Sequence, residues 1–270
     1  PELHTLVKYL EPSALMGQTI TDVHIPWPGS IARLRPESFL RTLIGRRIET
    51  LTRRAKWIVW KMDGGLTMLT HLRMTGRFHL TAPGAAYGKH DHVAFTIDGK
   101  RQLRYHDTRK FGRFYLPDST AMLDRLGPEP LSRQFTARKL AKRLAAHRRQ
   151  LKPLLLDQHF LAGLGNIYVD EALWDAGLHP TRASDRLTDG EVRRLHRAIR
   201  KVLRRGLRNL GTTLGTGETT FYSVAGHRGR NRDELKVFRR TGEPCPRCRK
   251  VITRLVVGQR STHICEVCQK

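Results

Sequence analysis

The first 115 residues alternate short apolar runs, rich in β-branched and aromatic residues, with turn signals. Residues 57–62 and 66–72 flank a Gly-Gly pair, which predicts a β-hairpin. Residues 92–97 are followed by Asp98-Gly99, a strong signal for a two-residue turn, and then by a further apolar run. Because strand follows strand without regular helical crossovers, we expect an opening helix and a mostly antiparallel β-sandwich.

The pattern changes after residues 126–130, where two prolines flank one residue and predict a linker. Helical periodicity follows, and its longest stretch places arginines outward. The inward positions are Leu140 and Leu144 in one helix, and Val192, Leu195, Ile199, Val202 and Leu203 in the longer one. Residues 211–234 are rich in Gly, Thr, Ser and Asn and predict a long loop, which in a compact domain is usually functional.

These patterns define a multi-domain α+β protein. We expect an N-terminal domain at 1–117, an antiparallel β-sandwich with flanking helices. A linker at 118–131, a helical domain at 132–240 and a cysteine-containing module at 241–270 follow.

Charge adds information about the partner. The chain carries 50 Lys and Arg against 24 Asp and Glu, a formal net charge of +26. Basic side chains that neutralise phosphates release counterions, so a nucleic acid is the natural partner. A highly charged soluble surface or a ribosome-associated protein is the alternative. There is no apolar run of about 20 residues and no signal peptide, so we expect a cytoplasmic protein.

All four cysteines lie near the end, as two CxxC pairs separated by sixteen residues: Cys245, Cys248, Cys265 and Cys268. Four thiolates close a tetrahedral shell and leave no open position, so we expect one structural Zn²⁺. The module is too small to fold on its own core, and metal binding should supply its folding energy. Residues 256–263 predict a hairpin with Arg260 at its tip.

Several motifs, in order, make the chain resemble the formamidopyrimidine-DNA glycosylase family of bacterial DNA-repair enzymes over nearly its whole length. The residues that carry the resemblance are PEL at 1–3, RRAK at 53–56, HLRMTG at 71–76, DTRKFG at 107–112, LAGLGNIYVDEAL at 161–173 and GQRSTH at 258–263. The resemblance implies a helix–two-turn–helix DNA-binding domain at 132–240 and damaged double-stranded DNA as partner. It also implies a monomer associated with the nucleoid.

The implied activity is a bifunctional glycosylase and AP lyase that removes oxidised purines. Pro1, exposed once an initiator Met is removed, would attack the sugar C1′ with its secondary amine and form a Schiff base. Strand cleavage by β- and δ-elimination would follow. Glu2 is the matching acid. The resemblance assigns Lys56 a contact to a phosphate or to the 8-oxo group beside the lesion.

The resemblance also implies a DNA-binding set. Met74, Arg109 and Phe111 would fill the hole left when the damaged nucleotide swings out, which offsets part of the flipping cost. Arg260 would clamp the phosphates that flank the lesion and belongs to the catalytic set as well. Contacts to the DNA backbone are also expected from His71, Lys152 and Asn166, the last at a glycine-rich turn before a helix N-terminus. The segment 211–234 corresponds to the family's lesion-capping loop.

One departure bears on activity. The family usually begins PELPEVE, whereas Thr5 stands here where the second glutamate is expected, or about three residues are missing. Three rival functions therefore stay open: an endonuclease VIII-like glycosylase for oxidised pyrimidines, a lesion-binding protein with impaired catalysis, and a ribosome-associated or RNA-binding zinc protein. Leu3 and the complete void-filling trio favour the purine-directed branch.

Overall fold

The computed structural model describes residues 1–10, 15–214 and 228–270, which form two compact units. Unit 1 comprises Pro1–Asp124 and the described part of Asn209–Arg232, and unit 2 comprises Arg125–Arg208 and Asp233–Lys270. The sequence boundaries place residues 209–232 in the helical domain, whereas the described residues of this segment pack with unit 1. The physical reason is pairing within that unit, since the Arg230 amide donates to the Asn209 carbonyl and the Thr212 amide donates to Glu2.

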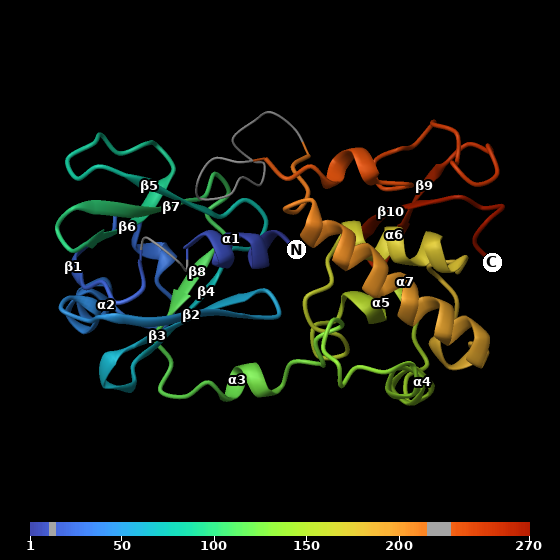
Figure 1. Cartoon of the computed structure of the whole chain (residues 1–270), viewed down its shortest axis with the longest axis horizontal. Helices are drawn as coiled ribbons and strands as arrows, with labels where there is room; N and C mark the ends of the chain where they lie inside the picture. The colour runs from blue at the N-terminus through green and yellow to red at the C-terminus, as the bar shows by residue number, and fades with distance from the viewer. Residues whose placement is uncertain (11–14, 215–227) are drawn as a thin grey trace. The chain divides into compact units, whose positions relative to one another are not determined.

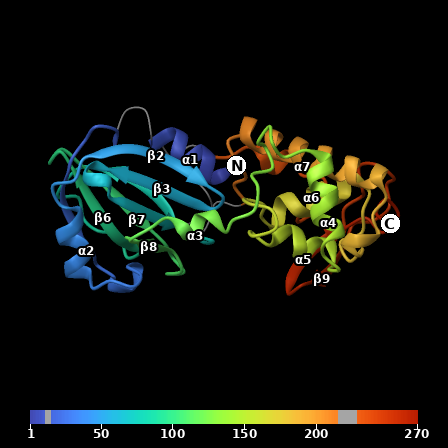
Figure 2. The same ribbon diagram turned by 90° about the horizontal axis from the view of Figure 1, so that it is seen from below.

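Unit 1 is a sandwich of two antiparallel sheets (Figure 1, Figure 2). One sheet has the strand order β2-β3-β4-β8 and the other β1-β6-β7-β5. The strands are β1 Ile20–His24, β2 Ile48–Arg54, β3 Trp57–Met62, β4 Thr67–His71, β5 Arg77–Thr81, β6 Asp91–Ile97, β7 Arg101–His106 and β8 Arg113–Tyr115. The helices are α1 Glu2–Leu10, α2 Pro36–Leu43 and α3 Ala121–Asp124, the last within the expected linker.

Aromatic side chains from both sheets meet in the core of unit 1. Trp60 of β3 lies edge-on to Phe78 of β5 at 5.8 Å between ring centroids, and Phe95 of β6 lies 5.6 Å from Phe114 of β8. All four side chains are at most 1% exposed. Such tilted and edge-to-face pairs add to the free energy of burial itself. The predicted sandwich is therefore confirmed, with its core between the two sheets.

Both predicted hairpins form. Strands β3 and β4 pair with Trp60 opposite Met68. The turn between β6 and β7 has positive φ at Asp98 (49°) and Gly99 (66°), the requirement of a type I′ turn. The Asp98 carboxylate also accepts the Thr19 amide, which ties the turn to the start of β1.

Unit 2 contains the helices from α4 onward and the finger. They are α4 Ala137–Ala145, α5 Leu151–Leu156, α6 Asn166–Ala176 and α7 Asp189–Arg208, followed by the hairpin strands β9 Thr253–Val257 and β10 Arg260–Ile264. Short 3₁₀ turns lie at Pro28–Ser30 and Asp63–Gly65 in unit 1 and at Ser184–Arg186 in unit 2. A further 3₁₀ turn, Asn231–Glu234, lies where the chain passes from unit 1 into unit 2. All seven positions predicted to face inward in α4 and α7 are buried, so the helical period was interpreted correctly.

Helix α6 is the centre of unit 2. It packs against α5, α7 and β10, and most of its side chains are buried. It ends at Gly177, whose φ of 71° supplies the left-handed residue that commonly terminates a helix. In the described part of the chain no helix is long and apolar enough to cross a membrane.

Candidate functional site

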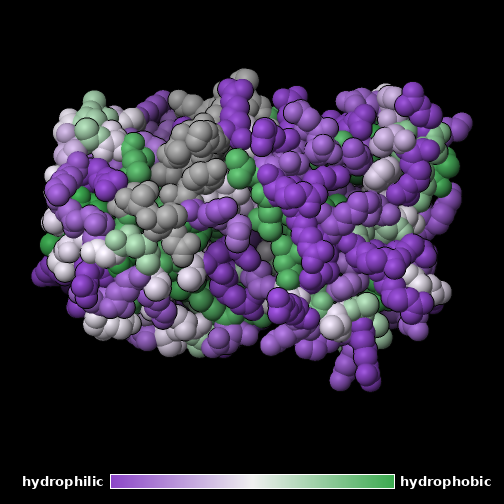
Figure 3. Space-filling model, viewed as in Figure 1, coloured by the Kyte–Doolittle hydropathy of each residue, from purple (hydrophilic) through white to green (hydrophobic). Residues whose placement is uncertain are grey.

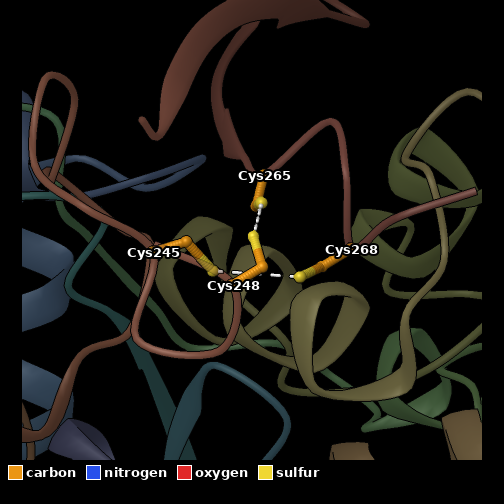
Figure 4. A group of neighbouring side chains, drawn as sticks. All are labelled: Cys245, Cys248, Cys265 and Cys268. Carbon is orange, nitrogen blue, oxygen red and sulfur yellow. Dashed lines mark hydrogen bonds between the residues drawn. The ribbon is translucent and has the colours of Figure 1, made fainter. Parts of the chain in front are cut away.

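The four cysteines converge in the finger (Figure 4). Their Sγ atoms all lie within 4.8 Å of one another, and the Cys248–Cys265 and Cys245–Cys268 separations are 3.3 and 3.9 Å. A tetrahedron with Zn–S bonds of about 2.3 Å has edges of about 3.8 Å. Both the donor set and its spacing therefore fit one Zn²⁺.

Backbone amides prepare one thiol for metal binding. Burial alone would raise the pKa of Cys245, but the amides of Arg247 and Cys248 lower it to about 6. The Trp174 indole also donates to Cys245 Sγ at 3.4 Å. A bound cation would favour the thiolate form at all four positions. The predicted structural zinc site is confirmed, and since all four donors are protein thiolates, it leaves no position for catalysis.

The finger hairpin is held on α5 and α6 by the Ser261 carbonyl and by the Asp170 carboxylate. The Ser261 carbonyl accepts from Lys152 Nζ at 2.8 Å and from Asn166 Nδ2 at 2.9 Å. Asp170 accepts from Lys152 Nζ and from the His263 amide at 3.0 Å. The hairpin is thus fixed next to Arg260, whose own side chain is exposed at the start of β10.

Lys152 is not available as the DNA contact that the sequence suggested. Its side chain is 0% exposed and forms an ion pair with the equally buried Asp170. Burial lowers the pKa of Lys152, while the Asp170 carboxylate opposes that effect. Because Nζ is enclosed by Asp170 and Ser261, we correct its assignment to an internal one.

Asn166 lies where the sequence placed it, as the first residue of α6 after Gly165. Gly163 has a φ of 85°, so the preceding turn needs a residue without a Cβ. An N-terminus of this kind presents backbone N–H groups to an anion. A phosphate contact at this end of α6 stays a prediction.

In unit 1, Pro1 and Glu2 lie side by side at the start of α1. The Pro1 nitrogen is 3.6 Å from Glu2 Oε2, and Glu2 Oε1 accepts the Thr212 amide at 2.9 Å. Despite the departure at Thr5, α1 begins at Glu2, and the Thr5 amide donates to the Pro1 carbonyl at 2.9 Å. Thr5 itself is buried. The helix therefore accommodates the changed first turn.

Lys56 lies in the turn between β2 and β3, after Ala55 with its φ of 53°. His71, at the end of β4, is close enough for the charges of Arg73 and Lys56 to act on it. Burial first, and then these two cations, lower the pKa of His71 to about 4. Its Nδ1 accepts the Arg73 amide at 3.0 Å, so at neutral pH the ring is uncharged and offers an Nε2–H donor.

Met74, Arg109 and Phe111 converge from two separate loops. Arg109 Nη1 is 3.2 Å from Met74 Sδ, and its guanidinium lies 4.7 Å from the Phe111 ring centroid. Met74 is 62% and Phe111 47% exposed, although both are large apolar side chains. Exposed apolar groups gathered around an arginine are typical of a binding surface. The structure brings the predicted trio together.

Sequence reasoning missed Asp107. Its side chain is fully buried, and it accepts hydrogen bonds from both loops that carry the trio. The only local signal is its place at the head of the DTRKFG motif.

The predicted capping loop, residues 211–234, has its middle part at 215–227, and these residues lie outside the described ones.

Comparison with known proteins extends these observations. Family models match residues 1–114 (Formamidopyrimidine-DNA glycosylase N-terminal domain), 126–217 (Formamidopyrimidine-DNA glycosylase H2TH domain) and 242–270 (Zinc finger found in FPG and IleRS). Two relatives named formamidopyrimidine-DNA glycosylase are 43% identical, from Protochlamydia amoebophila, and 42% identical, from Chloroflexus aurantiacus. Each alignment covers all of this chain and 98% or 96% of the relative.

Solved structures agree. A complex of a Lactococcus lactis FPG mutant with DNA containing Fapy-dG superposes with a TM-score of 0.92 at 33% identity and covers 100% of this chain and 98% of that one. A complex of Lactococcus lactis Fpg with DNA containing an abasic site superposes equally well.

The fold and the finger, together with the matching family models and solved structures, define a DNA-binding protein of the base-excision-repair glycosylase class. The chain belongs to the formamidopyrimidine-DNA glycosylase family. At this level the expected family, fold, zinc site and enzyme class are confirmed.

Proposed function

We propose that this chain removes oxidised purines, 8-oxoguanine and formamidopyrimidines, from duplex DNA with Pro1 as nucleophile. The observation that carries the proposal is the Pro1 nitrogen 3.6 Å from a Glu2 carboxylate oxygen. An α-amine has a pKa near roughly 8, so part of it is neutral and nucleophilic at cellular pH. The adjacent carboxyl group supplies the acid that opens the sugar ring.

The reaction balances within the chain and its substrate. The amine forms a bond to C1′, the bond from C1′ to the base breaks, and the base leaves with the electron pair and a proton. The Glu2 carboxyl group then protonates O4′, the C1′–O4′ bond breaks, and the opened sugar is joined to Pro1 as an iminium. This iminium acidifies the C2′ proton, and its loss expels the 3′ phosphate by β-elimination. A second elimination expels the 5′ phosphate, and water releases the sugar remnant from Pro1.

We assign the contacts with DNA to side chains of both units. Arg260, exposed on the finger hairpin, clamps phosphates beside the lesion, and the N-terminus of α6 at Asn166 binds a further phosphate. Lys56 contacts a phosphate or the lesion, and His71 donates from Nε2. Met74, Arg109 and Phe111 fill the space that the flipped nucleotide vacates, and Arg109 pairs with the orphaned base.

Damaged duplex DNA is therefore the partner that the site supports. We further propose that the protein acts as a monomer, in the cytoplasm and on the nucleoid. Sedimentation of the protein with a lesion duplex tests the monomeric state, since one copy of the protein per duplex is expected.

Borohydride trapping on a duplex with 8-oxoguanine opposite cytosine tests the chemistry. The protein that begins at Pro1 is compared with a form that retains one extra N-terminal residue, and with Glu2→Gln. A covalent adduct is expected for the first protein, and none for the extended form, because its terminal secondary amine is gone.

Two other outcomes decide between rival functions. Lesion-selective binding without adduct or cleavage establishes a lesion-binding protein, the alternative that the changed residue Thr5 brings up. Faster excision of oxidised pyrimidines than of 8-oxoguanine establishes the endonuclease VIII-like alternative.

A further inference from the structure

Asp107 is a buried carboxylate that accepts five hydrogen bonds from neutral donors. Its Oδ1 accepts from the Thr75 hydroxyl and from the Arg109 amide at 3.2 Å. Its Oδ2 accepts from the Tyr105 hydroxyl at 3.0 Å, and from the amides of Phe111 and Gly112 at 2.9 Å each. A buried anion so fully satisfied fixes the geometry of every group that donates to it.

Apart from the Tyr105 hydroxyl of β7, these donors come from the two loops that carry the void-filling trio. Thr75 directly follows Met74, and the amides of Arg109 and Phe111 belong to the other two members. The two loops, residues 72–76 and 107–112, are therefore joined through one carboxylate.

Tyr105 also connects the two loops, because its phenol packs against a glycine of each loop region. A Cβ added to Gly76 would lie 2.5 Å from the Tyr105 hydroxyl, and one added to Gly112 would lie 1.6 Å from it. Each loop thus places a glycine against the phenol, where no side chain fits. The hydroxyl in turn donates to Asp107.

We propose that Asp107 is a positioning residue that makes Met74, Arg109 and Phe111 insert as one rigid group. The inference rests on the void-filling role proposed above. An insertion group must be rigid, because a displacement of about 1 Å can cost roughly a hundredfold in rate. Because Asp107 itself is fully buried, it acts through these three side chains and not by its own contact with DNA.

Thr75→Val tests the link between the loops, because it keeps the shape of the side chain and removes only the hydroxyl. The matched control is Thr70→Val, which removes another buried hydroxyl, one that bonds to Trp60 and not to Asp107. Excision is measured under single-turnover conditions with 8-oxoguanine opposite cytosine and opposite adenine. Borohydride trapping on single-stranded abasic DNA, which has no opposite base, reports the Pro1 chemistry alone.

For Thr75→Val we expect duplex excision to fall about tenfold to a hundredfold. The preference for cytosine over adenine falls too, while single-strand trapping is unchanged. Asp107→Asn should have a larger effect, because its amide would face the N–H groups of Phe111 and Gly112. If Thr75→Val behaves like Thr70→Val on the duplex, the inference is overturned.

Variants of the void-filling side chains themselves, here called the direct variants, separate this inference from the function on which it rests. If Arg109→Ala and Phe111→Ala impair duplex excision while Thr75→Val does not, only the positioning role fails. If the direct variants leave duplex excision and base preference intact, the void-filling role itself fails.

The outer face of α7 carries a row of exposed basic side chains. Five basic side chains share one side of this helix at i, i+4, i+8, i+11 and i+15 and are exposed; this α7 basic face consists of Arg193, Arg197, Lys201, Arg204 and Arg208. At 1.5 Å per residue it extends over about 22 Å. Figure 3 shows hydrophilic side chains gathered over α7.

The positive charge of this face is little compensated within the described residues. Lys201 pairs with Asp175 at 2.6 Å. None of the four arginines of the α7 basic face forms an ion pair with a described residue. Like charges four residues apart destabilise a helix, and two such arginine pairs lie here, 193/197 and 204/208. Within unit 2, α6 packs against both α7 and β10, so the face is distinct from the finger hairpin of Arg260.

We infer that the α7 basic face binds the phosphate backbone of undamaged duplex DNA. Regular arginines along 22 Å suit a polyanion with evenly spaced charges, and forked guanidinium groups suit phosphate oxygens. Such a contact carries no sequence information and would hold the protein on DNA during its search.

The test replaces the four arginines of the face with Gln, which has a similar helix propensity. The control replaces four exposed basic residues of unit 1 with Gln: Arg41, Arg47, Lys61 and Lys100. Affinity for a long undamaged duplex is measured against salt concentration.

We expect the slope of log K against log salt to fall by about 2 to 4 for the α7 variant, since each lost phosphate contact removes about 0.9. The control should change it by less than one. Equal slopes for the two variants overturn the inference, and the face is then a solvated surface or binds another partner.

Discussion

The Nζ atom of Lys152 lies 2.5 Å from Oδ1 of Asp170, and neither side chain is exposed. The pair connects α5 to α6, and through the Ser261 carbonyl it reaches the hairpin that carries Arg260. A lysine that the sequence marks as a DNA contact therefore acts inside the molecule, where it sets the position of a residue that does face outward.

Lys152→Met should lower the free energy of unfolding of unit 2 by about 3–5 kcal/mol, because it leaves the Asp170 charge buried without its partner. The double variant Lys152→Met/Asp170→Asn should recover much of the loss. Urea denaturation followed by far-UV circular dichroism measures both. A single variant as stable as the wild type would show that the Lys152–Asp170 pair does not hold α5 on α6.

Zinc removal should unfold the finger and abolish DNA binding, while the sandwich of unit 1 stays folded. The finger core is small, with Val237, Ile252 and two cysteines among its few buried residues, so the metal supplies most of its folding energy. Chelation with metal analysis should release one Zn²⁺ per chain. Cys265→Ser should reproduce the effect, and retained lesion binding by zinc-free protein would contradict it.

His71 should titrate far below the ordinary histidine range, at about pH 4 in the folded protein. Its pKa in the unfolded chain is about 6.5, so between these values the unfolded state binds more protons. The stability that the neutral ring contributes is present above pH 6.5 and is lost as pH falls towards 4. The loss is at most about 3 kcal/mol.

NMR titration of the His71 ring checks this value directly. The stability difference between wild type and His71→Gln should shrink as pH falls from 6.5 to 4. A His71 pKa near 6.5 would show that the ring is solvated and charged in weak acid.

Much of the architecture could be predicted because its signals are local. Alternating strands, the Asp98-Gly99 turn and the inward positions of α7 each depend on residues close in sequence. The zinc site was predictable because the spacing within each CxxC pair is itself the geometry of two ligands.

The internal polar groups could not be predicted in this way. Lys152 precedes a proline and looks like a surface lysine, and its burial depends on Asp170 and on Ser261, which is 109 residues away. Asp107 likewise shows its role only when Thr75, 32 residues earlier, closes on it. Motif reasoning found the groups proposed to contact DNA more readily than the groups that hold them.

Glu171 is a further buried polar group whose partners lie far away in the sequence. This carboxylate of α6 is 1% exposed and accepts the amides of Lys236, Val237 and Phe238 at 2.9–3.1 Å. It also pairs with Arg205 of α7 at 2.8 Å. One side chain therefore joins α6, α7 and the segment that leads into the finger.

Glu171→Ala should cost about 3–5 kcal/mol, because it leaves three amides and a largely buried guanidinium without their acceptor. Glu171→Gln keeps one oxygen for the amides but turns an NH₂ group towards Arg205, so we expect an intermediate loss. The matched control is Glu243→Gln, whose exposed pair with Arg240 should contribute less than about 1 kcal/mol. Urea denaturation of the zinc-loaded protein measures all three. If Glu171→Ala were as mild as the control, water would have to replace the carboxylate at all three amides, and the link between α6 and the finger would not depend on this residue.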